Sequence, residues 1–118
     1  MSLVCSRYAE AFFNLSLQEN AIDEYHDDLM AVCYIYQNES AFRKFLLTPQ
    51  NDIKLKKQVL ANIFKNKIGK NTLNFLMLLL DKSRFHHLPE IYAQFVKLAD
   101  KERNMLSIVV ATALPLEQ

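Results

Sequence analysis

The sequence has a single glycine, Gly69, among its 118 residues. A dinucleotide-binding fingerprint needs three glycines in one turn, so the scarcity of glycine excludes it. The segment around Gly69 also fails as a phosphate-binding loop, because Phe64 stands where that loop has its first glycine and Asn71 where it has a hydroxyl residue. The sequence therefore predicts no nucleotide site, and we expect no bound cofactor.

Cysteine is also scarce, with only Cys5 and Cys33 in the chain. Both fall on predicted helix faces, and a chain with enough apolar residues for a core does not need disulfides. We therefore expect two free, buried thiols. No local signature of a general base accompanies either cysteine, so nucleophilic catalysis is not predicted.

The three histidines do not form a metal-ligating pattern. His86 and His87 are adjacent, so on a helix they would point about 100° apart and could not share a metal ion. His26, Asp27 and Asp28 are also consecutive, so their side chains would point in different directions and could not share a metal ion. We expect neither a metal site nor catalytic residues, and hence a binding protein rather than an enzyme.

Residues 75–80 form a run of six consecutive apolar residues. This is far short of the roughly 20 residues that cross a bilayer. The N-terminus lacks a charged region followed by an apolar stretch and a small-residue cleavage site, so we predict no signal peptide and a protein that stays inside the cell.

The composition, with 51% hydrophobic and 23% charged residues, is typical of a single helical domain with a core. The helical spacing of apolar residues and the positions of helix-capping and helix-breaking residues predict an all-α, six-helix bundle. The predicted helices are Val4–Leu17, Ala21–Tyr36 with Asn20 as N-cap, Ser40–Leu47, Asp52–Phe64, a fifth containing Thr72–Lys82, and Pro89–Arg103. The expected core stripes are Ile22, Tyr25, Leu29, Cys33 and Tyr36 in the second helix, Leu55, Val59 and Ile63 in the fourth, and Ile91, Phe95 and Leu98 in the sixth.

The character of the sequence changes after Asn104. Ser107–Ala113 is short and rich in β-branched residues, which predicts a strand. A lone strand has nothing to pair with, so we expect the chain to be a fragment of a longer protein. The predicted division is residues 1–105 as the helical bundle and residues 106–118 as a linker and the first strand of a missing C-terminal domain.

Charge is distributed unevenly along the chain. Residues 10–40 carry seven acidic and no basic side chains, whereas residues 43–70 carry eight basic side chains against Asp52. Such runs are typical of solvated helix faces. An alternative is an all-helical RNA-binding module that uses residues 43–70, although the aromatic residues among these bases, Phe45 and Phe64, sit on apolar stripes.

The first and fifth helices carry more apolar surface than one packing face needs. On the first, the apolar arc spans about 200° at about 100° per residue. Four residues of this arc fall within about 60° of one another: Val4, Tyr8, Ala11 and Leu15. On the fifth, Leu73, Leu76, Met77 and Leu80 form one face, and Phe75, Leu78 and Leu79, with the stem of Lys82, form another.

Two interpretations of this excess remain open. Both helices could be central in the bundle and buried on all sides. Alternatively, their spare faces could lie side by side and form a groove for an amphipathic helix of a partner, which the small Ala11 would allow to approach closely.

The run Arg7-Tyr8-Ala9-Glu10-Ala11-Phe12 resembles the RYAxAL opening of the δ subunit of bacterial F-type ATP synthases, whose mitochondrial counterpart is the oligomycin sensitivity conferral protein. The resemblance extends over the whole chain. The further matches are Asn38-Glu39, Phe45-Leu46-Leu47 with Pro49, Asn74-Phe75-Leu76 with Leu79 and Leu80, Arg84, Leu88-Pro89-Glu90-Ile91 with Phe95, and Ala113-Leu114-Pro115-Leu116. Ser83 stands where the family often has glycine.

The resemblance implies a non-catalytic stator subunit of a proton-translocating ATP synthase. In this family the six-helix N-terminal domain binds the N-terminal helix of an α subunit between its first and fifth helices, and so clamps the catalytic head to the peripheral stalk. The b subunits of the stalk would bind the missing C-terminal domain. The implied location is the cytoplasmic face of the bacterial cell membrane, reached only through the complex, with no nucleic-acid partner.

Family positions carry the groove role over to Tyr8, Ala11, Phe75, Leu78 and Lys82. The helical periodicity adds Val4, Leu15 and Leu79, and Asn74 also stands at the family position. The predicted partner-binding groove is therefore Val4, Tyr8, Ala11, Leu15, Asn74, Phe75, Leu78, Leu79 and Lys82.

Overall fold

The computed structural model describes residues 3–113, with side chains described for residues 3–105. Over this part of the chain the protein forms six α-helices, one short 3-10 helix and no strand, which confirms the all-α fold. The elements are α1 (Leu3–Gln18), α2 (Ile22–Asn38), α3 (Ser40–Leu47), α4 (Ile53–Phe64), α5 (Lys70–Asp81), η1 (Phe85–His87) and α6 (Leu88–Ala113).

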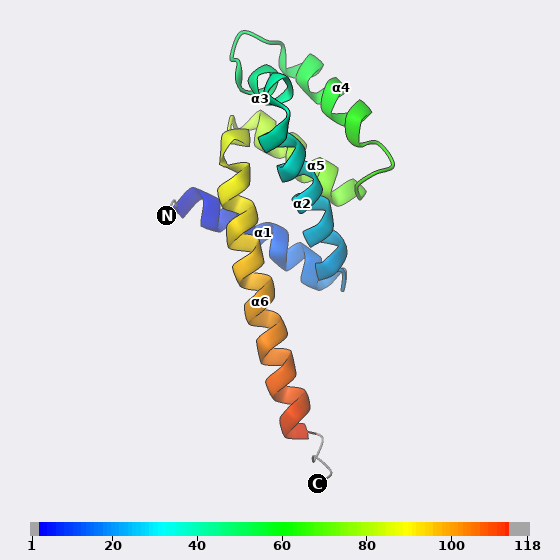
Figure 1. Cartoon of the computed structure of the whole chain (residues 1–118), viewed down its shortest axis with the longest axis vertical. Coiled ribbons are helices and arrows are strands. Elements are labelled where there is room, and N and C mark those ends of the chain that lie inside the picture. Colours follow the sequence, from blue (N-terminus) through cyan, green and yellow to red (C-terminus); the bar gives the residue numbers. More distant parts are fainter. Residues whose placement is uncertain (1–2, 114–118) are drawn as a thin grey trace.

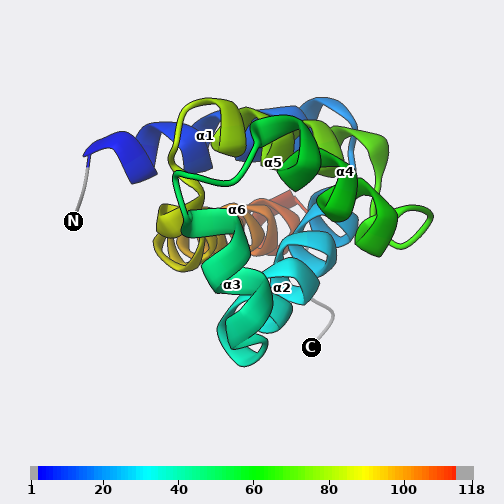
Figure 2. The same ribbon diagram turned by 90° about the horizontal axis from the view of Figure 1, so that it is seen from above.

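The helices surround a core that is rich in phenylalanine. α1 crosses α6 and makes its most extensive contacts with it, while α2 packs on α6, α3 on α2 and α4 on α5 (Figure 1). Seen from above, α5 lies alongside α1 with α4 outside it (Figure 2). The largest side chains in the core, each less than 2% exposed, include Phe12, Phe64, Phe85, Phe95, Leu29, Leu60, Leu76, Leu79, Leu88 and Ile91.

α6 continues well beyond the bundle and projects from it at the lower end of the molecule (Figure 1). The radius of gyration is therefore 16.6 Å, larger than the about 13.5 Å typical of a compact domain of this length. α6 runs through Ser107–Ala113, where the sequence predicted a strand. A helix pairs its own backbone groups, whereas a strand without neighbours would leave them unpaired. The strand, which needs neighbouring strands, stays a prediction. The division at residue 105 stays a prediction.

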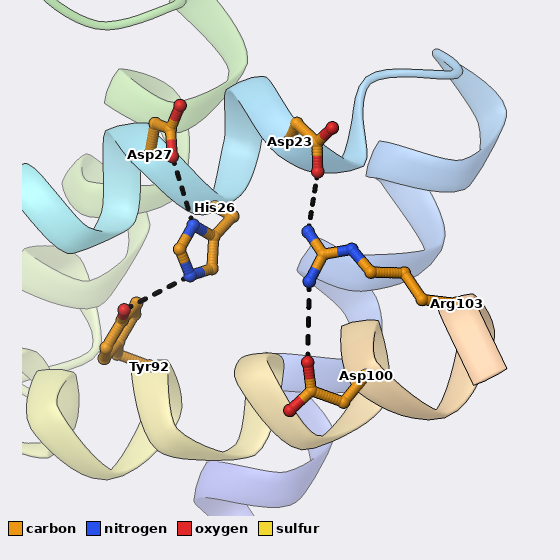
Figure 3. Close-up of polar contacts among 6 residues, drawn as sticks. All are labelled: Asp23, His26, Asp27, Tyr92, Asp100 and Arg103. Carbon is orange, nitrogen blue, oxygen red and sulfur yellow. Dashed lines mark hydrogen bonds and ion pairs between the residues drawn. The ribbon is translucent and has the colours of Figure 1, made fainter.

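Two polar contacts link α6 to α2 (Figure 3). The Arg103 guanidinium donates to Asp23 on α2 at 2.6 Å and lies 3.5 Å from Asp100 on its own helix. Nearer the bundle, the Tyr92 hydroxyl and His26 Nε2 share a hydrogen bond of 3.2 Å. Exposed ion pairs contribute only about 0–1 kcal/mol each, so the pair of Arg103 and Asp23 adds little to the stability of the bundle.

Both helices of the predicted groove end in the same backbone motif. Asn20 and Ser83 adopt positive φ angles of 51° and 55°. The amides that follow them, Ala21 N and Arg84 N, donate back to carbonyls five residues earlier, at 2.9 and 2.8 Å. These are Schellman C-caps, which explains why glycine suits the position of Ser83. They also correct the prediction for Asn20, which ends α1, while Ala21 stands at the N-cap of α2.

The inward face of α4 differs from the prediction. Leu55 is 46% exposed, whereas Lys56 is only 8% exposed and shares the buried stripe with Leu60 and Phe64. The predicted stripe and the observed one lie about 100° apart on the helix. Burial of the large Phe64 ring in the core selects the second stripe, and the aliphatic stem of Lys56 is buried with it.

The N-terminus of α5 is capped by a residue from α2. Gly69 N and the Thr72 hydroxyl both donate to Asp28 Oδ2, each at 2.9 Å. Asp28 thereby supplies the carboxylate that the first turn of α5 lacks in its own sequence. A negative charge at a helix N-terminus also interacts favourably with the helix dipole. This contact joins two helices whose capping partners are 41 residues apart.

We expect Asp28→Ala to lower the free energy of unfolding by about 1–3 kcal/mol, because it removes the cap and leaves the buried Thr72 hydroxyl without its acceptor. Urea denaturation measures the loss. Asp27→Ala is the matched control, since it removes the same charge from the same helix at an exposed carboxylate whose polar contact within the described chain is with His26. Equal losses in the two variants would contradict the capping role.

Candidate functional site: an apolar groove between α1 and α5

A groove of about 600 Å³ runs between α1 and α5. Its lining is mainly apolar. The residues are Val4, Arg7, Tyr8, Ala11, Phe12 and Leu15 from α1, Asn71, Asn74, Phe75 and Leu78 from α5, and Arg84 from the segment after α5.

Aromatic rings form the floor of the groove. The rings of Phe12 and Phe75 stack with their centroids 4.4 Å apart, and Tyr8 meets Phe75 edge-on at 6.3 Å. Phe12 is 1% and Phe75 8% exposed, so both are largely covered by the bundle. The backbones of α1 and α5 make few close approaches. The rings therefore bridge the two helices at depth while the helices stay apart at the surface.

Smaller and more exposed side chains stand above this floor. Ala11 on α1 is exposed, and Leu78 on α5 has an exposed fraction of 41%. Val4, Tyr8 and Leu15 are half-buried along α1. The interpretation that both helices are buried on all sides therefore does not hold for the described residues, and the surplus apolar surface predicted from the sequence lies open to solvent.

The structure brings seven of the nine predicted groove residues together: Val4, Tyr8, Ala11, Leu15, Asn74, Phe75 and Leu78. The other two lie elsewhere. Leu79 is 0% exposed and packs into the core, because one residue beyond Leu78 the helix has turned by about 100°. Lys82 is exposed at the C-cap of α5, outside the groove lining. Its role in binding stays a prediction.

Sequence reasoning did not assign four of the lining residues: Arg7, Phe12, Asn71 and Arg84. Phe12 belonged to the apolar arc of the first helix, but only the stacked ring of Phe75 shows that it forms the floor. Arg7 and Arg84 are part of the matched sequence motifs, and no periodicity argument could have placed Arg84 because it lies between helices.

The other candidate chemistry of the chain is not supported by its geometry. Cys5 and Cys33 are buried and not joined by a disulfide, as expected, and burial raises the pKa of the Cys33 thiol, which disfavours the reactive thiolate. The rings of His86 and His87 lie 4.0 Å apart. Burial, then the charges of His87 and Arg84, lower the pKa of His86. Within the described residues, no three side chains of the usual ligand types are grouped around a possible metal position.

Part of the basic segment over residues 43–70 is engaged in contacts within the bundle. Lys57 pairs with Asp81 at 2.6 Å, and Arg43 donates to the carbonyl of Tyr36 at 2.9 Å. Phe64 is 1% exposed, so its ring could not stack on a base. These contacts favour the interpretation of the segment as ordinary helix surface.

Comparison with known proteins gives a consistent family. The family described as ATP synthase delta (OSCP) subunit matches residues 4–118. The chain is 35% identical over 117 residues to ATP synthase subunit delta of Acetivibrio thermocellus, covering 99% of this chain and 66% of that protein. It is 36% identical over 115 residues to the same subunit of Alkaliphilus metalliredigens, covering 98% of this chain and 64% of that one.

A third relative, ATP synthase subunit delta of Symbiobacterium thermophilum, is 30% identical over 115 residues, which is 98% of this chain and 62% of the relative. The chain thus spans a little under two thirds of the length of each of these three relatives. Among the described residues, no helix combines the length and the apolar character that a bilayer crossing requires. Since the family match covers nearly the whole sequence, the chain belongs to the ATP synthase delta (OSCP) subunit family.

Proposed function

We propose that this chain is the head-binding part of a non-catalytic stator subunit of an F-type ATP synthase. Its groove would hold the N-terminal helix of one α subunit and so fix the catalytic head to the peripheral stalk. The observation that carries the proposal is the open apolar groove between α1 and α5, which coincides with seven of the residues predicted for that role.

The shape and chemistry of the groove suit an amphipathic helix. An α-helix with side chains is about 10–12 Å across, and the exposed methyl group of Ala11 is small enough to let such a helix lie close to the floor. The rings of Phe12 and Phe75 are already packed in the free chain. A preformed floor reduces the entropy that binding must overcome.

The proposed role is mechanical. The head of a rotary ATP synthase must not turn with the central shaft, so a clamp on the head has to connect to a stationary stalk. We propose that a C-terminal domain of the longer protein binds the b subunits of that stalk. The chain would then lie at the cytoplasmic face of the bacterial membrane, held there by the complex.

Titration with a peptide of the α-subunit N-terminus from the same source, about 22 residues or ~33 Å of helix, tests the proposal. We expect saturable changes in backbone NMR shifts, clustered at Tyr8, Ala11, Phe75 and Leu78. Residues on α4 that lie away from the groove, such as Lys54, serve as the internal control. Absence of binding at about 1 mM peptide, or shifts centred on α4, would refute the groove as the site.

A further inference from the structure

The two ends of the groove differ in charge. α1 and α5 run antiparallel along it: Tyr8 meets Phe75 near the middle, and Asn71 at the start of α5 donates to Glu19 just past the end of α1, at 3.3 Å. The first turns of α1 therefore lie beside the last turn of α5. Arg7 and Arg84 line the groove at that end, which makes it cationic.

Among the residues whose side chains the structure describes, no acidic partner is paired with Arg7 or Arg84. Among the described residues, neither guanidinium takes part in an ion pair or a side-chain hydrogen bond. The other arginines of the bundle behave differently, since Arg43 donates to two backbone carbonyls and Arg103 pairs with Asp23. Arg84 is moreover half-buried, where an unpaired charge is less well solvated.

The backbone explains how Arg84 reaches the groove. The left-handed Ser83 closes α5 and lets Arg84 N donate to Leu79 O at 2.8 Å, so the chain reverses at this point. Arg84 thus comes to line the groove although it lies outside α5. A guanidinium has donors arranged to bind a carboxylate through two parallel hydrogen bonds.

We propose that the helix bound in the groove carries an Asp or Glu side chain close to one end of its apolar stripe, and that this carboxylate binds between Arg7 and Arg84. This inference rests on the proposed function, since it specifies the chemistry of the partner helix at the same site. Apolar contacts allow a helix to slide or to bind in either direction. A charge pair at one end fixes its position and direction along the groove.

A double-mutant cycle tests the pair. Each Asp or Glu of the α-subunit peptide is changed in turn to Asn or Gln, and binding is measured by calorimetry to the wild-type chain and to Arg7→Gln and Arg84→Gln. We expect one acidic position whose loss weakens binding to the wild-type chain about tenfold but has little further effect in the arginine variants. That coupling should shrink at high salt.

Lys54→Gln and Lys67→Gln are the matched controls, because each removes a positive charge from an exposed side chain outside the groove lining. Their effect on affinity should be less than about twofold. Arg7 is exposed, so its variant should fold even if Arg84→Gln does not. Wild-type binding with no acidic position coupled to either arginine would overturn the inference and leave the groove intact. No wild-type binding would instead refute the proposed function.

Discussion

Leu78→Asp should abolish binding of the α-subunit peptide, lowering its affinity by at least about 100-fold, while the free chain keeps its helicity. Leu78 has an exposed fraction of 41%, so a carboxylate at this position stays hydrated in the free chain. In the complex the same carboxylate would be buried beneath an apolar helix face without a partner, which costs several kcal/mol. Calorimetry measures the affinity and circular dichroism the helicity.

Leu55→Asp is the control for this result. Leu55 is exposed to a similar extent, 46%, but lies on α4 outside the groove lining. The control should bind the peptide like the wild-type chain. A loss of helicity in Leu78→Asp would show that Leu78 supports the core. Equal loss of binding in both variants would show that the peptide responds to charge in general rather than to the groove.

The neighbouring residues Leu78 and Leu79 show which part of the site the sequence could predict and which part it could not. Periodicity identified a second apolar face on the fifth helix and assigned both leucines to it. Burial separates them, because Leu79 packs into the core at 0% exposure while Leu78 faces the groove. The width of an apolar arc can be read from a sequence, but the point where the core ends and the surface begins depends on which helices pack against it.

Contacts between distant parts of the chain could not be predicted from the sequence either, because they too depend on which helices pack together. No local pattern indicates that Asp28 caps α5, since the carboxylate and Gly69 N are brought together only by the packing of α2 against α5. On α4 the sequence predicted the stripe of Leu55, Val59 and Ile63 as the inward face, whereas the structure buries Lys56, Leu60 and Phe64. Helix type and approximate ends were predictable because they depend on local periodicity and chain-breaking residues.

The core and the groove of this protein share the same aromatic residues. Phe12 contacts Tyr25 on α2, Phe75 on α5 and Phe95 on α6, with ring centroids 5.0, 4.4 and 5.6 Å apart. Its ring therefore joins α1 to three other helices and also lines the groove floor. A residue in this position links the stability of the bundle to the shape of the site, so the two cannot vary independently there.

Phe12→Ala should accordingly lower the free energy of unfolding by about 3–5 kcal/mol, since it removes a fully buried ring and leaves a cavity that three helices surround. The stability of a domain of this size is about 5–15 kcal/mol, so the variant should be near the limit of folding. Urea denaturation followed by circular dichroism measures the change. Phe42→Ala is the control, because Phe42 is half-buried and packs at the edge of the core, with its ring edge-on to Phe64 at 6.2 Å. Its loss should be clearly smaller. A comparable loss in both variants would show that Phe12 is not the centre of the aromatic cluster. Retained stability together with weakened peptide binding in Phe12→Ala would show that the floor serves the site alone.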